Sequence, residues 1–85
     1  MKAVVSIGSN IDDPKANLDL AIALLREATE VKSVSKYFET APVGVTNQPN
    51  FLNAVLILES ELPAADLLSV LHGIEKAMGH KRELR

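Results

Sequence analysis

The stretch that decides the fold is Leu52–Glu59, "LNAVLILE", an almost unbroken apolar run. A short run rich in Val, Ile and Leu predicts a β-strand rather than a loop. Because apolar side chains would point to both sides of this strand, the run predicts burial on both faces or a central place in the sheet. The other elements are placed outward from it in both directions.

Three elements are predicted before this strand. Ala3–Ile7 is dominated by β-branched residues and ends at Gly8-Ser9-Asn10, which predicts a short buried strand. A helix is predicted from Pro14, with an aspartate before it as N-cap. Its apolar residues recur at helical spacing, at Leu18, Ala21, Ile22, Leu25 and Ala28. Val31–Phe38 alternates imperfectly and predicts an edge strand.

One more helix is predicted after the central strand. Pro63 begins it and Gly79 ends it, and its apolar stripe consists of Leu67, Val70, Leu71, Ile74, Ala77 and Met78. The order β-α-β-β-α is that of an α+β, ferredoxin-like (split βαβ) sandwich that lacks its last strand, with an antiparallel sheet and the helices on one face. Without that strand the Ala3–Ile7 edge would be open. We therefore expect it to be covered by another copy of the chain, as a homo-oligomer, or by the remainder of a longer protein.

Length and composition bound the class of protein. The 85 residues are predicted to form a single, apparently incomplete domain, with 47% hydrophobic and 24% charged residues and no cysteine. The absence of cysteine suits a reducing compartment. The apolar run at the N-terminus is too short for a secretory signal or a membrane span, so we expect a cytoplasmic protein. Residues 76–85 are basic although the net charge is −2. That cluster suits a phosphate-bearing ligand or is simply a solvated end.

A long connection, Thr40–Asn53 or "TAPVGVTNQPNFLN", precedes the central strand. Pro42 and Pro49 remove backbone donors, so the segment is predicted to be neither helix nor regular strand. Long irregular loops in compact domains usually serve binding or are disordered. Asn53 offers the donor and acceptor that an amide-like heterocycle edge requires, and Phe51 offers a stacking face, but equally Asn53 could satisfy loop backbone groups and Phe51 could belong to the core.

A second set of polar residues follows in and after the last helix. His72 and Glu75 share a helix face, and His80 and Arg82 come just beyond. The scattered spacing argues against a metal site and is better explained by solvent exposure. A contact with phosphate or ribose is the alternative use for Glu75, His80 and Arg82.

Four segments together resemble one enzyme family. They are "IGSN" at Ile7–Asn10, "YFETAPVG" at Tyr37–Gly44, "QPNFLNA" at Gln48–Ala54, and "IE" with "GHKR" between Ile74 and Arg82. The whole chain resembles the N-terminal half of the 6-hydroxymethyl-7,8-dihydropterin pyrophosphokinases (HPPK). The resemblance implies a folate-pathway reaction in which ATP, the co-substrate, transfers pyrophosphate to the pterin hydroxymethyl group.

The resemblance also implies site residues. Pterin binding would fall to Thr40, Ala41, Val43, Phe51 and Asn53, with Phe51 stacked on the ring, and nucleotide binding to His72, Glu75, His80 and Arg82. His72 and His80 stand where other members often carry Gln and Arg. The family's Mg²⁺ ligands, an Asp-x-Asp segment, are expected beyond residue 85. The chain would then contain no catalytic residue and no metal ligand, and we expect it to be inactive alone.

Two other classes of function compete with this one. A noncatalytic ferredoxin-like module could assemble through an open sheet edge. A nucleic-acid-binding domain is disfavoured by the acidic body of the chain and its 4% aromatic content. We therefore expect small-molecule partners, pterin and ATP, with no nucleic acid and no membrane.

Overall fold

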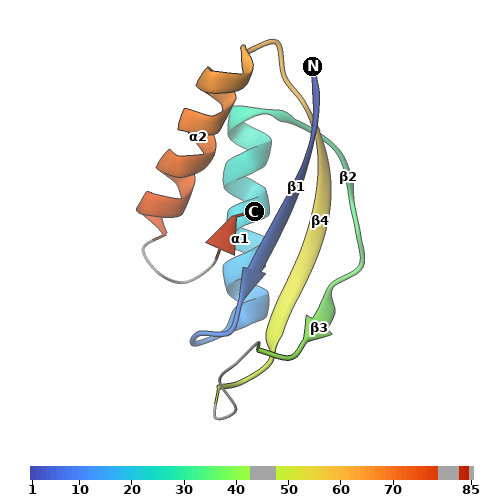
Figure 1. The fold of residues 1–85 in the computed structure, drawn as a ribbon, viewed down its shortest axis with the longest axis vertical. Coiled ribbons are helices and arrows are strands. Elements are labelled where there is room, and N and C mark those ends of the chain that lie inside the picture. The colour runs from blue at the N-terminus through green and yellow to red at the C-terminus, as the bar shows by residue number, and fades with distance from the viewer. Residues whose placement is uncertain (43–47, 79–82, 85) are drawn as a thin grey trace.

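A computed structural model describes residues 1–42, 48–78 and 83–84. Along the chain the elements are β1 (Lys2–Ser9), α1 (Pro14–Ala28), β2 (Glu30–Val34), β3 (Phe38–Thr40), β4 (Phe51–Glu59), α2 (Ala64–Ala77) and β5 (Glu83–Leu84). The sheet order is β2-β4-β1-β5, and β3 also pairs with β4. All pairs are antiparallel, and Figure 1 shows both helices on the same side of the sheet. This confirms the predicted α+β, ferredoxin-like architecture.

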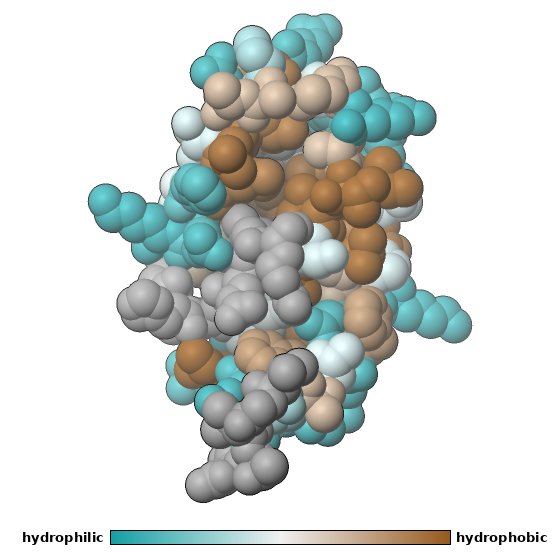
Figure 2. All heavy atoms as spheres, viewed as in Figure 1, coloured by the Kyte–Doolittle hydropathy of each residue, from teal (hydrophilic) through white to brown (hydrophobic). Residues whose placement is uncertain are grey.

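β4 takes the predicted central place but is buried on one face only. Ala54, Leu56 and Leu58 are fully buried beneath the helices, whereas Ile57 on the opposite face is 38% exposed. Its cross-strand neighbour Val4 is 70% exposed. Burial on both faces was therefore a wrong prediction, because only one side of this antiparallel sheet carries helices. Figure 2 shows apolar side chains at the surface over β1 and β4, where strands face the viewer.

The helices contribute unequally to the core. In α1, Leu18, Ala21 and Leu25 are fully buried, and the Asp13 Oδ1 accepts a hydrogen bond from the Ala16 N–H at 3.2 Å, as expected of the N-cap. Within α2 only Leu67 is buried, although Leu71 and Ile74 pack partly against the core. Ala77 is exposed, contrary to the predicted stripe. The α2 residues that contact the core, Leu67, Leu71 and Ile74, follow the a/d spacing of a heptad and form a narrower stripe, and Ala77 lies at its margin.

The predicted single edge strand at Val31–Phe38 is two strands. β2 pairs with β4 through a register shift between Val31 and Ser33, and this bulge lets Val31 and Val34, three residues apart, both face the helices. Ser35 then ends β2: its Oγ accepts a hydrogen bond from the Val55 N–H at 2.9 Å. The Ser35 N–H still donates to the Val55 carbonyl at 2.9 Å, so the side chain replaces one of the two ladder bonds at this position, where β2 ends.

The edge of β1 was predicted to be open within this chain and covered from elsewhere, but its C-terminal end is covered by the chain itself. β5 pairs there, with Leu84 opposite Ile7 and Glu83 opposite Gly8. Two residues are too few to be recognised as a strand from sequence, and they adopt this conformation by pairing with β1. Among the described residues, Lys2–Ser6 have no strand partner on that side of β1.

In the described part of the chain, neither helix combines the length and the apolar character needed to cross a bilayer.

Candidate functional site

A short strand pair closes the base of the proline-containing loop. β3 and β4 pair with Phe38 opposite Asn53 and Thr40 opposite Phe51. The prediction that Thr40–Asn53 contains no regular strand is therefore wrong at both of its ends. Pro42 and Pro49 fall outside the paired residues, as their missing N–H groups require. The pairing holds the two ends of the loop at fixed positions on the sheet.

Asn53, near the beginning of β4, holds this strand pair together through its side chain. Its side chain is 4% exposed, and its Nδ2 donates to the Thr40 Oγ1 at 2.9 Å, the Phe38 carbonyl at 3.2 Å and the Phe51 carbonyl at 3.3 Å. Because carbonyl oxygens only accept, these partners fix which end of the carboxamide is the nitrogen. Asn53 thus satisfies backbone groups and at the same time orients the Thr40 hydroxyl.

A cavity of about 240 Å³ lies beside Asn53. It is lined by Ser6, Phe38, Thr40 and Asn53, which come from β1, β3 and β4. The register places these side chains on the sheet face that the helices leave uncovered, because Ala54 and Leu56 alternate with them to the buried face. One aromatic ring and three polar side chains suit a planar heterocycle with a polar edge.

The cavity contains two of the five predicted ring-binding residues, Thr40 and Asn53. Phe51 is half-buried, lies opposite Thr40 on the same sheet face and is not one of the residues packed on the core. Ala41 is exposed next to β3. Val43 lies outside the described residues. Phe51 therefore keeps a face available for stacking, although it does not line the cavity itself.

Sequence reasoning missed Ser6 and Phe38 as cavity residues. Strand alternation carries the signal for Ser6, because Val5 and Ile7 face the core and the residue between them must face the other way. Phe38 was assigned to the end of an edge strand, and its place on the open face follows only from the pairing with Asn53.

The "IGSN" segment is connected to the proline-containing loop by hydrogen bonds. Ser9 and Asn17 are buried, and the Asn17 Nδ2 donates to the Ser9 Oγ at 3.1 Å and to the Ile11 carbonyl at 2.9 Å. This network holds the turn between β1 and α1. From that turn, the Asn10 Nδ2 donates to the Gln48 Oε1 and to the Pro49 carbonyl, each at 3.3 Å. Asn10 therefore links a rigid turn to the end of the proline-containing loop.

Tyr37 attaches the other end of the loop to α1. Its hydroxyl donates to the Asp19 Oδ1, and Asp19 also forms an ion pair with Lys15 at 2.8 Å. Burial and then the hydrogen bond to Asp19 raise the pKa of Tyr37 to about 12. The pKa of Asp19 is lowered, first by Lys15 and then by Tyr37. Tyr37 faces α1 while its neighbour Phe38 faces the cavity, so this contact positions β3.

The raised pKa predicts a pH dependence of stability. The native state favours protonated Tyr37, so the stabilisation is complete below the unfolded-state value of about 10 and is lost as pH rises through about 12. The difference in free energy of unfolding between the parent and Tyr37→Phe should be constant up to pH 10 and shrink towards pH 12. Urea denaturation of both proteins at several pH values measures it. A difference that does not change over this range would contradict the Tyr37–Asp19 contact.

Of the four predicted nucleotide-binding residues, the two that the structure describes lie in the helical layer. His72 is exposed and Glu75 half-buried, both on α2, whereas His80 and Arg82 lie outside the described residues. The cavity opens on the other face of the sheet, so the described structure does not bring His72 or Glu75 to it. Within residues 1–42, 48–78 and 83–84 no group of three acidic, histidine or cysteine side chains could hold a metal ion.

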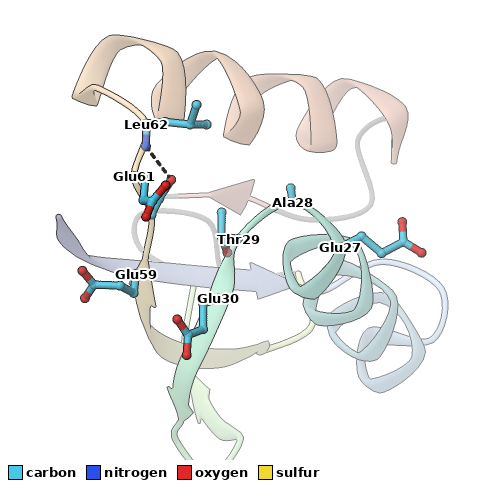
Figure 3. A pocket seen from close by; sticks show the side chains of 8 residues that line it. Glu27, Ala28, Thr29, Glu30, Glu59, Glu61 and Leu62 are labelled. Carbon is cyan, nitrogen blue, oxygen red and sulfur yellow. Dashed lines mark hydrogen bonds between the residues drawn. The ribbon is translucent and has the colours of Figure 1, made fainter.

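A larger hollow of about 580 Å³ lies beside the end of β4, the start of β2 and the C-terminal end of α1. Four of its lining residues are glutamates, Glu27, Glu30, Glu59 and Glu61, and Figure 3 shows Glu27 directed away from the other three. Lys32 pairs with Glu30 at 2.9 Å, and the Met1 ammonium pairs with Glu59 at 3.2 Å. A surface with this charge repels phosphate, so the smaller cavity is the better candidate site.

The chain is thus an α+β, ferredoxin-like domain with a cavity lined by polar residues on the open face of its sheet. Residues 4–85 match the family described as 7,8-dihydro-6-hydroxymethylpterin-pyrophosphokinase (HPPK). The chain belongs to this family, as its motifs predicted.

Similar curated proteins come from bacteria and plants. The 2-amino-4-hydroxy-6-hydroxymethyldihydropteridine pyrophosphokinase of Bacillus subtilis is 39% identical over 98% of this chain and 51% of its own length. The enzyme of the same name from Pseudomonas aeruginosa is 33% identical over 99% of this chain and 53% of its own length. A mitochondrial folate synthesis bifunctional protein of Arabidopsis thaliana is 42% identical over 99% of this chain and 15% of its own length. The chain thus spans about half the length of the two bacterial relatives.

Proposed function

We propose that this chain forms the pterin-binding part of an ATP-dependent pyrophosphokinase that acts on 6-hydroxymethyl-7,8-dihydropterin in folate biosynthesis. The observation that carries the proposal is the cavity beside Asn53, where two residues of the family's ring-binding motifs, Thr40 and Asn53, meet on the open sheet face. Membership of the family supports the reaction class.

The pterin ring lies over β4 in this proposal. Its amide-like edge faces Thr40 and the backbone of Ala41 and Val43, and Asn53 holds Thr40 in place. Phe51, on the same sheet face, stacks on the ring. A site of this kind discriminates strongly against rings that lack the polar edge, because its own polar groups would be left unpaired.

ATP is the co-substrate in the proposal, with His72, Glu75, His80 and Arg82 on the nucleotide side. Mg²⁺ would bring charge neutralisation to the phosphates, and its ligands belong outside these 85 residues. The chain by itself is therefore expected to be inactive. The compartment proposed is the cytoplasm.

The uncovered parts of the sheet need a partner in this proposal. In the described part of the chain, no strand pairs with Lys2–Ser6 on the outer side of β1, and Val4 within this stretch is exposed. The remainder of a longer protein would cover them, and a second copy of the chain is the alternative. The same observation favours, as a second candidate function, a noncatalytic module that assembles through this edge.

Calorimetric titration of the complete gene product with 6-hydroxymethylpterin tests the proposal. The titration is done with and without Mg²⁺ and a non-hydrolysable ATP analogue. Saturable pterin binding is the expected result, and its absence under both conditions would contradict the proposal. Sedimentation of the same samples addresses the second function, which requires self-association without pterin binding.

A further inference from the structure

We propose that Ser6 is a specificity-determining residue of the cavity, and that its hydroxyl recognises the hydroxymethyl substituent of the ring. The inference rests on the proposed function, because it concerns the orientation of the same ligand.

Of the polar side chains that line the cavity, Ser6 is the one with no hydrogen bond to another described residue. The Asn53 Nδ2 already donates hydrogen bonds to three acceptors, and the Thr40 Oγ1 is one of these acceptors. Among the described residues, no hydrogen bond involves the Ser6 side chain, although it is half-buried and lines the cavity. A half-buried hydroxyl with no internal partner gains a hydrogen bond when a ligand supplies one.

The sheet order places Ser6 and Thr40 at opposite ends of the cavity. β4 lies between β3 and β1, so Thr40 and Ser6 stand on the two strands that flank Asn53. Neighbouring strands are about 4.8 Å apart, so β3 and β1 are separated by roughly 10 Å. Thr40 pairs with Phe51 and Ser6 with Val55, so the two residues are also offset by about 13 Å along β4, and they lie diagonally across it, roughly 16 Å apart. A two-ring heterocycle with a one-carbon substituent spans this separation when it lies obliquely over β4 and is hydrogen-bonded at both of its ends.

The chemistry of the two ends sets the direction of the ring. The β3 end offers the Thr40 hydroxyl and the extended backbone that follows it, which suits an amide-like edge with both donors and acceptors. The β1 end offers one hydroxyl, which can donate and accept a single bond to another hydroxyl. The ring's amide edge therefore faces β3, and its hydroxymethyl group faces Ser6. A bond there orients the hydroxyl that receives the pyrophosphoryl group.

Two ligands and one substitution isolate this contact. In the complete gene product, the dissociation constants of 6-hydroxymethylpterin and 6-methylpterin are measured by calorimetry for the parent and for Ser6→Ala. Ser6→Ala should raise the dissociation constant of 6-hydroxymethylpterin about threefold to tenfold and leave that of 6-methylpterin unchanged. Ser6→Thr keeps the hydroxyl and should preserve the parent's preference. Ser69→Ala is the matched control, since the Ser69 Oγ donates to the Ala65 carbonyl within α2.

Equal weakening of both ligands by Ser6→Ala, or no weakening of either, would overturn the inference while the proposed function stands. Thermal melts of each variant show whether a loss of binding reflects loss of the fold, and Ser6→Thr then decides the question. If the parent protein binds neither pterin, the proposed function fails, and the role of Ser6 fails with it.

Discussion

Replacing Leu56 with alanine is expected to lower the free energy of unfolding by about 2–5 kcal/mol. Leu56 is fully buried at the centre of β4. Its cross-strand neighbours, Val5 on β1 and Val34 on β2, face the same core, so the neighbouring strands cannot easily close over the space left behind. Urea denaturation of the parent and the variant measures the loss.

Ile57→Ala is the matched control, because Ile57 is the next residue on the same strand. It faces the uncovered side of the sheet and is 38% exposed, so its truncation should cost less than about 1 kcal/mol. Comparable losses for Leu56→Ala and Ile57→Ala would contradict the one-sided core. They would show that the open face is covered in solution, by another copy or by further chain.

Phe51→Ala is expected to weaken pterin binding by about 1–3 kcal/mol, the magnitude typical of a base stacked on an aromatic side chain. The free energy of unfolding should change far less than in Leu56→Ala, because Phe51 is half-buried and not part of the core. Calorimetry with 6-hydroxymethylpterin, together with urea denaturation, separates the two effects.

Phe51→Leu distinguishes stacking from simple burial. It keeps much of the apolar volume but removes the aromatic face, so it should lose most of the affinity that Phe51→Ala loses. Unchanged affinity in Phe51→Ala would contradict the stacking role. A large loss of stability with unchanged affinity would assign Phe51 to the core instead.

The segments whose apolar residues recur at a clear helical or strand spacing could be predicted from the sequence, because each of them buries its apolar face whichever elements pack against it. The helix from Pro14 and the strand through Leu56 are examples. What the sequence alone could not supply were features that depend on pairing. Ser35 interrupts a strand because its hydroxyl meets the Val55 N–H, and Glu83–Leu84 is a strand because Ile7 and Gly8 lie beside it. Such effects have no periodic pattern.

The candidate site was predictable to a similar extent. Thr40 and Asn53 could be identified by their motifs, and the structure brings them together through one hydrogen bond. Ser6 belongs to a different segment, 47 residues before Asn53, and reaches the cavity only because β1 pairs with β4. Its orientation was readable from alternation, but its place beside Asn53 required the register.

The pairing of the first strand with β4 also dictates when the chain can fold during translation. The Met1 ammonium donates to the Glu59 Oε1 at 3.2 Å and to the Ser60 carbonyl at 2.8 Å, contacts that join residues 58 and 59 positions apart. β1 can therefore complete its pairing with β4 only after residue 60 has left the ribosome. Until then β1 lacks the partner strand that fixes its register.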